Sequence, residues 1–160
     1  MLLVFIITLL PVQAGAQAAP FDLAAALAAA APGATVLVPP GVYAGPLLIE
    51  KPVVLVGQDN PVIDGGGLGD VITINAPAVT IRGFIVRNSG DSLDHEHAGI
   101  TGLAAQATLE DNRLENVLFG IYLKNAPNSV VRNNLVLSKN LEIGRRGDSI
   151  RLWYCERALV

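Results

Sequence analysis

From Ala34 onward the chain is dominated by short apolar runs, three to five positions long, that alternate with glycine, proline or polar turns. The runs are rich in valine, isoleucine and leucine, as in Thr35–Val38, Pro46–Ile49 and Val53–Val56. β-Branched residues in runs of this length, bounded by turn residues, are typical of β-strands. Because the turns leave no room for crossover helices, the pattern predicts short strands joined by tight turns.

The segment before these strands has a different composition. Asp22 opens an alanine-rich stretch that reaches Ala31 and ends at Pro32 and Gly33. Alanine has the highest helix propensity, aspartate is a good N-cap, and Pro-Gly stops a helix. The stretch therefore predicts one short helix, placed where it can cap the apolar first layer of a strand stack.

The second half of the chain repeats itself. The segments that begin at Gly99, Gly120 and Ser149 resemble one another, and Leu109–Leu114 resembles Val131–Val136. A period near 20 residues is the signature of a solenoid. No helical pattern accompanies the repeats, so each coil consists of strands that stack in parallel on the next coil. The predicted fold is all-β: a right-handed parallel β-helix (solenoid) with a short N-terminal capping α-helix.

The repeat assigns structural roles to two pairs of equivalent residues. Asn112 and Asn134 share one turn position, where stacked amides bond along the solenoid axis. Gly99 and Gly120 are also equivalent, and we expect them to mark a bend that needs either a positive φ or a close backbone approach.

Two intervals of the repeat are longer than the others by about seven residues. The surplus falls in 88–97 and in 139–147. Insertions in a solenoid form loops, often on one face, and we expect the second loop to lie one coil above the first.

The two ends of the sequence also carry predictions. Residues 1–18 resemble a signal peptide, with an apolar run at Leu2–Leu10 followed by small residues. The run is shorter than a membrane span, so we expect export to the periplasm with no membrane span after cleavage. The β-helix domain then covers 19–160. Since it stops in mid-repeat at Val160, we expect a C-terminally truncated domain, consisting of the N-terminal coils of a longer protein.

Charge and cysteine content narrow the functional classes. The 160 residues carry a formal charge of -3, only 16% are charged, and no Lys/Arg run occurs. This composition argues against nucleic acid as a partner. Cys155 is the single cysteine, so no internal disulfide is expected, and we predict a small core residue within a strand.

Both histidines of the chain lie at the end of the first insertion, as His95 and His97 on either side of Glu96. In an extended segment these imidazoles project to one side, and imidazole is a good ligand for copper and zinc. We therefore predict a metal site of His95, His97 and Glu96 that holds copper transiently, because two histidines do not close a storage site. The other interpretation is a solvated loop.

The charges of the two insertions suggest a docking surface. Asp91 and Asp94 lie in the first, and Arg145 and Arg146 lie in the second. Loops of opposite charge on one face would bind a protein partner together, although such charges are more often simply exposed.

An enzymatic interpretation needs carboxylates that converge on a groove. The candidates are spread along the chain, and they assign no catalytic residue: Asp91, Asp94, Glu96, Asp111 and Glu115. Asp64, which precedes three glycines, is interpreted as a turn former. Tyr122 and Trp153 would suit the flanks of a sugar groove, but we expect Trp153 to pack beside a strand.

Several segments together resemble the NosD-type periplasmic β-helix proteins of nitrous oxide reductase maturation. They are Pro32–Tyr43, Ile49–Gly57, Pro61–Gly67, Val79–Phe84, Leu118–Leu123 and Ile150–Trp153. The resemblance implies a non-enzymatic accessory protein that works with an ABC-type transporter and assists copper delivery to nitrous oxide reductase. Many secreted β-helices share the opening segments, so the alternative is a secreted carbohydrate-binding protein, polysaccharide lyase or glycoside hydrolase.

Overall fold

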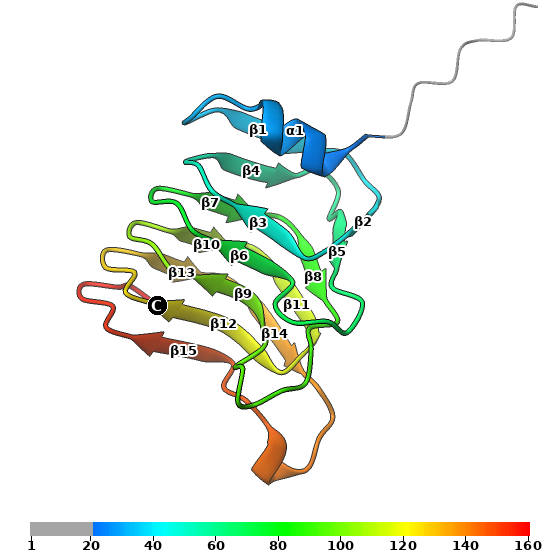
Figure 1. The fold of residues 1–160 in the computed structure, drawn as a ribbon, viewed down its shortest axis with the longest axis vertical. Coiled ribbons are helices and arrows are strands. Elements are labelled where there is room, and N and C mark those ends of the chain that lie inside the picture. The colour runs from blue at the N-terminus through cyan, green and yellow to red at the C-terminus, as the bar shows by residue number, and fades with distance from the viewer. Residues whose placement is uncertain (1–20) are drawn as a thin grey trace, which may run out of the picture.

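A computed structural model describes residues 21–160. The predicted signal peptide, 1–18, lies outside the described residues. Within them, the chain winds through successive coils of three strands, and every strand pairs in parallel with its equivalent in the next coil (Figure 1). The predicted right-handed parallel β-helix is confirmed.

The strands form three parallel sheets of five strands each, which we call sheets A, B and C. Sheet A contains β1 (Thr35–Val38), β4 (Val54–Gly57), β7 (Thr80–Arg82), β10 (Thr108–Glu110) and β13 (Val130–Arg132). Sheet B contains β2 (Val42–Ala44), β5 (Val62–Asp64), β8 (Ile85–Arg87), β11 (Arg113–Val117) and β14 (Leu135–Ser138). Sheet C contains β3 (Leu47–Ile49), β6 (Ile72–Ile74), β9 (Ala98–Gly102), β12 (Phe119–Lys124) and β15 (Ile150–Trp153).

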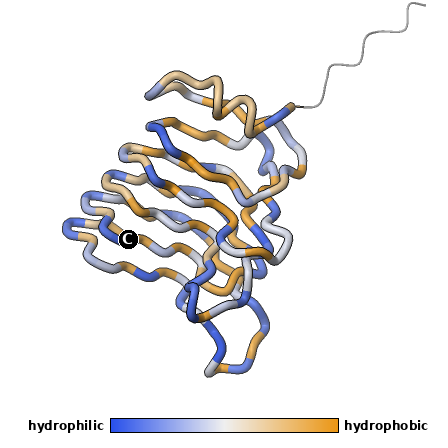
Figure 2. Tube along the Cα trace, in the orientation of Figure 1, coloured by the Kyte–Doolittle hydropathy of each residue, from blue (hydrophilic) through white to orange (hydrophobic). Residues whose placement is uncertain are grey.

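The lumen of the coils is filled by aliphatic side chains stacked in rows. Alternate residues of each strand point inward, so the same position in successive coils makes one continuous row. Figure 2 shows apolar positions recurring in every strand, with the most hydrophilic stretches in turns and loops. One row of sheet C consists of Leu47, Ile72, Ile100, Ile121 and Ile150. This stacking explains why a chain with few aromatic residues still builds a core.

The register agrees with the repeat read from the sequence. Ile100 pairs with Ile121, and Leu109 pairs with Val131, as their equivalence predicted. Ile72 pairs with Ile100 across the longer interval, so the surplus residues lie outside the ladder.

Helix α1 (Leu23–Ala29) caps the first coil, as predicted. Asp22 is its N-cap, and its Oδ1 accepts a hydrogen bond of 2.9 Å from the Ala25 backbone N–H. Leu23 and Leu27 are buried in the same core as the lumen residues. The helix is seven residues long, and no helix in residues 21–160 is long and apolar enough to cross a membrane.

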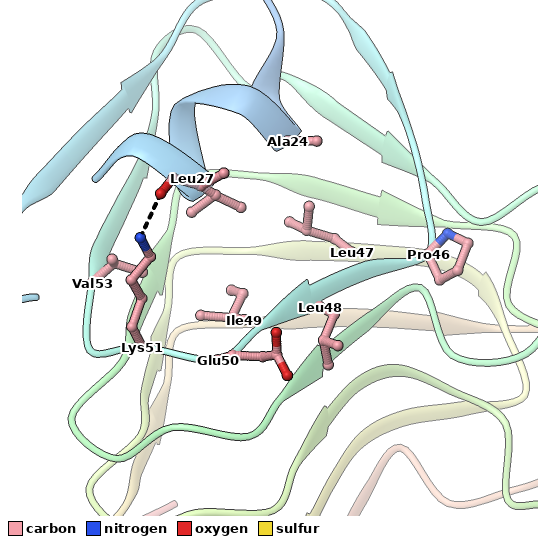
Figure 3. Close-up of a pocket in the computed structure, with 10 residues that line it drawn as sticks. Ala24, Leu27, Pro46, Leu47, Leu48, Ile49, Glu50, Lys51 and Val53 are labelled. Atoms are coloured by element: carbon pink, nitrogen blue, oxygen red, sulfur yellow. Dashed lines mark hydrogen bonds between the residues drawn. The ribbon is translucent and has the colours of Figure 1, made fainter. Parts of the chain in front are cut away.

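A shallow groove of about 240 Å³ runs between α1 and β3 (Figure 3). Leu27, Leu47 and Ile49 contribute apolar lining. The ammonium group of Lys51, at one end, donates hydrogen bonds of 2.7 Å to the carbonyls of Ala28 and Ala30. Lys51 thus satisfies carbonyls at the C-terminus of α1 and ties the cap to the first coil.

Asn112 and Asn134 form the predicted stack. Asn134 Oδ1 accepts hydrogen bonds from the backbone N–H and side-chain amide of Asn112, at 3.0 and 3.1 Å. Asn112 in turn accepts from the Phe84 backbone N–H at 3.1 Å and donates to the Ile81 carbonyl at 3.0 Å. The ladder therefore joins three coils through one buried turn.

Gly99 and Gly120 are explained by close approach rather than by a positive φ, which neither residue has. A Cβ on Gly99 would lie 2.7 Å from a methyl of Leu114, and one on Gly120 would lie 2.2 Å from the Ser149 carbonyl oxygen. No side chain fits where these strands enter sheet C.

One expectation about the last coil is wrong. Cys155 lies just beyond β15 rather than in a strand, although it packs on the core and its thiol donates to the Leu123 carbonyl at 3.3 Å. Trp153 is 47% exposed on the outer face of β15. Its neighbour along sheet C is the exposed Lys124, and its ring lies edge-on to that of Tyr154, with the ring centres 5.6 Å apart.

Replacing Asn112 by alanine should lower the free energy of unfolding by about 2–4 kcal/mol, because it leaves the buried Phe84 N–H and Ile81 carbonyl without partners. Urea denaturation of the full chain measures the change. Asn75→Ala, at an exposed asparagine, is the matched control and should change stability by less than about 0.5 kcal/mol. Equal effects of the two substitutions would contradict the structural role of the ladder.

Candidate functional site

Both insertions emerge at the same corner of the solenoid, between sheets B and C. The first connects β8 to β9, and the second, which contains the short 3-10 helix η1 (Ile143–Arg145), connects β14 to β15 (Figure 1). The prediction of loops on one face is confirmed. The prediction that they lie one coil apart is wrong, because β11 and β12 meet at this corner directly at Leu118, so a complete coil lies between the loops.

Residues Ser92–His97, here called the histidine turn, form a single capped turn. Ser92 Oγ accepts a hydrogen bond from the His95 N–H at 3.3 Å. The Glu96 N–H donates to the Leu93 carbonyl at 3.1 Å, and the His97 N–H donates to the Ser92 carbonyl at 3.3 Å. Glu96 has a φ of 53°, so it occupies the left-handed position at which such turns usually place glycine.

The histidine turn brings the two imidazoles together. The ring centroids of His95 and His97 are 5.7 Å apart, and the ring planes differ by 19°. His95 is exposed and His97 is half-buried. Nδ1 of His97 accepts a hydrogen bond of 3.4 Å from the Ser92 N–H, so in the neutral imidazole the ring proton lies on Nε2.

Glu96 is held by a residue from the far side of the corner. Its Oε1 lies 2.9 Å from Nη1 of Arg151, and both side chains are about one-third exposed, at 32% and 31%. Arg151 belongs to β15, two coils beyond the strand that follows the histidine turn. Its guanidinium lies over the rings of Phe119 and Tyr122, at 5.4 and 5.6 Å from their centres.

A small hydrophobic cluster outside the lumen supports this arrangement. We call it the outer cluster, and it consists of Ala98, Leu118, Phe119 and Tyr122, all buried, with Leu141 of the second loop packed against them. At the end of that loop, a Cβ on Gly147 would lie 2.8 Å from the Phe119 ring. The second loop therefore folds tightly back onto the corner.

Tyr122 is too buried to flank a sugar groove. Burial, followed by the neighbouring Glu96 carboxylate, raises the pKa of its hydroxyl above the ordinary value, while Arg151 opposes the shift. Trp153 lies on the same outer face but is exposed. The two aromatic residues therefore do not form a matched pair of walls.

The four charges of the predicted docking surface are all exposed: Asp91, Asp94, Arg145 and Arg146. Arg146 Nε donates a hydrogen bond of 2.6 Å to the Leu141 carbonyl within its own loop. Among the ion pairs of residues 21–160, the one that joins the two loop regions is Glu96–Arg151, with Asp148 a further 3.9 Å from Arg151 Nε.

The base of the first loop is fixed by a second polar ladder. Asp64 accepts hydrogen bonds from the Asn88 side chain at 2.8 Å, from the Gly66 N–H at 3.0 Å and from Arg87 Nε at 2.7 Å. Asn116 in the next coil donates to Asn88 at 2.8 Å. The bond from Asn88, then that from Gly66, hold the pKa of Asp64 below its ordinary value, with Arg87 adding to the effect. Asp64 forms the turn that the glycines predicted.

The other acidic residues do not gather into a catalytic group. Glu110 is buried between Arg82 and Arg132, at 3.7 and 2.5 Å, and Glu115 pairs with Arg113 of its own strand. Within the described part of the chain, no three side chains of the His, Cys, Asp and Glu types come together in a way that could hold a metal ion. His95 and His97 thus form a pair, with Glu96 directed to Arg151.

Sequence reasoning missed Arg151 as a member of the site. The signal was present in the repeat, because the alignment of Ile121 with Ile150 places Arg151 next to Tyr122 on the outer face. The contact between Arg151 and Glu96 was missed because a complete coil lies between these two residues.

The fold and the corner site define the class: a parallel β-helix that presents loop-borne side chains outside its lumen. The sequence comparison is more specific. The chain is 33% identical over 123 residues to a Pseudomonas aeruginosa protein named "Probable ABC transporter binding protein NosD", a match that covers 75% of this chain. It is 27% identical over 125 residues, or 76% of the chain, to the protein of the same name from Stutzerimonas stutzeri.

These matches confirm the resemblance, and the chain belongs to the NosD-type proteins. The chain spans 29% of the length of each of these two relatives. No protein-family profile matches the chain, and no solved structure matches it significantly.

Gly90 is packed against His97, since a Cβ there would lie 2.1 Å from Nδ1 and 2.7 Å from the Gly69 N. Gly90→Ala should therefore displace the His97 ring, and we expect the histidine side-chain NMR resonances of His97 to shift. Gly144→Ala is the matched control, since the added methyl meets no atom within 4 Å. An unchanged His97 spectrum in Gly90→Ala would contradict this packing.

Asp64 should contribute stability that depends on pH. Because its folded-state pKa is lowered, the contribution is complete above the unfolded-state pKa near 3.9 and is lost as the pH falls through the folded-state pKa. Asp64→Asn should cost about 1 kcal/mol at pH 7, and the difference from the wild type should narrow below about pH 4. Urea unfolding across the pH range measures it, with Asp59→Asn on an exposed turn as control. A difference that is constant with pH would be the contrary result.

Proposed function

We propose that the chain is part of a periplasmic accessory protein of nitrous oxide reductase maturation, which assists copper delivery together with an ABC-type transporter. The similarity to two proteins named as ABC transporter binding proteins NosD supports the assignment. The observation that carries the copper role is the position of the histidines: both lie on one presented turn outside the lumen, with their rings stacked at 5.7 Å.

Copper is the cargo in this proposal, and the donor set suits brief binding. Two imidazoles suit copper, whereas a closed structural site needs about four ligands. His95 is exposed, so an incoming ion reaches it from solvent, while the half-buried His97 would become the second donor at Nε2 when its ring proton moves to Nδ1 and the hydrogen bond from the Ser92 N–H is released. Glu96 lies between them and supplies the negative charge of the turn. The metal site proposed is therefore the turn that carries His95, Glu96 and His97, with the two imidazoles as its donors.

The partner surface proposed for the transporter lies around the same corner. Asp91 and Asp94 of the first loop and Arg145 and Arg146 of the second are exposed. Exposed charges of both signs around one site favour specific, oriented association with a partner of complementary charge. The enzymatic alternative has less support, because two of its candidate carboxylates, Glu96 and Glu115, are paired with arginine.

Titration of the full chain with copper in the presence of a competing chelator tests the proposal. The double substitution His95→Ala/His97→Ala should weaken copper binding by at least about tenfold, since both imidazole donors are lost. Glu142→Gln, at an exposed carboxylate of the second loop, is the control and should leave the affinity unchanged. Unchanged affinity and stoichiometry in the double variant would exclude the histidine turn as the copper site.

A further inference from the structure

The histidine turn is held in a conformation that its own sequence does not favour. Glu96 has a φ of 53°, a region in which glycine or asparagine is usual and glutamate is rare. Residues persist in such a conformation only where surrounding contacts determine it. The hydrogen bond from the His97 N–H back to the Ser92 carbonyl depends on this conformation, so it also sets how the two imidazoles lie relative to each other.

The side chain of Glu96 is held by a contact from Arg151. Its Nη1 lies 2.9 Å from the Glu96 carboxylate. The guanidinium has further contacts of its own, since it lies over the rings of Phe119 and Tyr122 and its Nε is 3.9 Å from the Asp148 carboxylate. The rings belong to the buried outer cluster, so Arg151 offers Glu96 a partner in one defined place.

We propose that Arg151 is the positioning residue of the histidine turn: it anchors the Glu96 carboxylate, so that Glu96 fixes the pair His95 and His97 and does not itself coordinate the metal. The part of this inference that concerns metal binding rests on the proposed function, which it makes more specific. The metal would be bound by imidazole alone, and Arg151 would set its affinity without touching it. The geometry also couples the histidine turn to β15, which the second loop leads into.

Arg151 and a metal ion would compete for the Glu96 carboxylate. The direction in which metal affinity changes when Arg151 is removed therefore distinguishes the two possible roles of Glu96. If Glu96 is an anchor, removing Arg151 frees the turn, disorders the imidazole pair and weakens metal binding. If Glu96 is instead a metal ligand that Arg151 occupies, removing Arg151 releases a ligand and strengthens metal binding. The two roles therefore predict opposite changes in affinity.

The first measurement is amide hydrogen exchange of the full chain without metal. In Arg151→Ala, the amides of Glu96 and His97 should exchange at least about tenfold faster than in the wild type, because the turn that protects them opens more often. Arg151→Lys should restore part of the protection, since lysine keeps the charge but lacks the planar fork. Arg113→Ala, at an arginine that pairs with Glu115 of its own strand, is the matched control and should leave these amides unchanged.

The substitution Glu96→Gly tests whether Arg151 acts on the turn through the Glu96 side chain. Glu96→Gly keeps the left-handed turn without an anchor, because glycine adopts a positive φ freely. In this background, Arg151→Ala should have no further effect on exchange at His97. The Glu96→Gly background also separates local opening of the histidine turn from general unfolding. If Arg151→Ala caused general unfolding, it would accelerate exchange both in the wild type and in Glu96→Gly.

The second measurement is the affinity for Cu(II) alone, by chelator competition. Arg151→Ala should weaken binding about tenfold, and Glu96→Gln, which keeps a hydrogen-bond acceptor for Arg151, should remain within about threefold of the wild type, with the nitrogen hyperfine pattern of the electron paramagnetic resonance spectrum unchanged. Tighter binding in Arg151→Ala, or unaltered exchange at Glu96 and His97, overturns the inference. A wild type that binds no copper removes the proposed function, while the exchange results still decide whether Arg151 positions the turn.

Discussion

The in-register hydrogen bonding between equivalent positions of successive coils is the constraint on which the rest of the structure depends. Each strand of sheet C pairs in register with the strand before it. Four isoleucines therefore lie in one row although their spacing in the sequence is unequal: Ile72, Ile100, Ile121 and Ile150. Since the ladder cannot absorb extra residues, every insertion is expelled at a corner. Both insertions use the corner between sheets B and C, which is how segments some fifty residues apart come to share a site.

At this corner the stacked coils form a second, smaller hydrophobic core, the outer cluster. The outer cluster is sealed by Leu141 from the second loop, and Arg151 joins the cluster to the first loop through Glu96. The polar ladder from Asp64 through Asn88 to Asn116 fixes the point at which the first loop leaves the strands. A histidine pair on an exposed loop is thereby attached to the rigid solenoid at both ends, the geometry that a presented binding site requires.

The fold could be predicted from the sequence because its determinants are local or periodic. The capping role of Asp22, the stacked pair Asn112 and Asn134, and the coil register all follow from residue type and spacing. The site was only partly accessible, since the repeat located its loops and its histidines but not Arg151. Contacts between side chains two coils apart depend on which way a loop folds back, and neither periodicity nor propensity encodes that direction. Cys155 was expected in a strand but lies outside one, because β15 ends at Trp153.

The similarity to NosD-type proteins and the geometry of the corner lead to one account: a rigid β-helix presents a histidine pair whose orientation is set by an ion pair across the coils. A double-mutant cycle on the free energy of unfolding, with Glu96→Ala, Arg151→Met and the combined variant, tests this account most directly. For a pair about one-third exposed, the account predicts a favourable coupling of about 0.5–1 kcal/mol. A coupling indistinguishable from zero would contradict it.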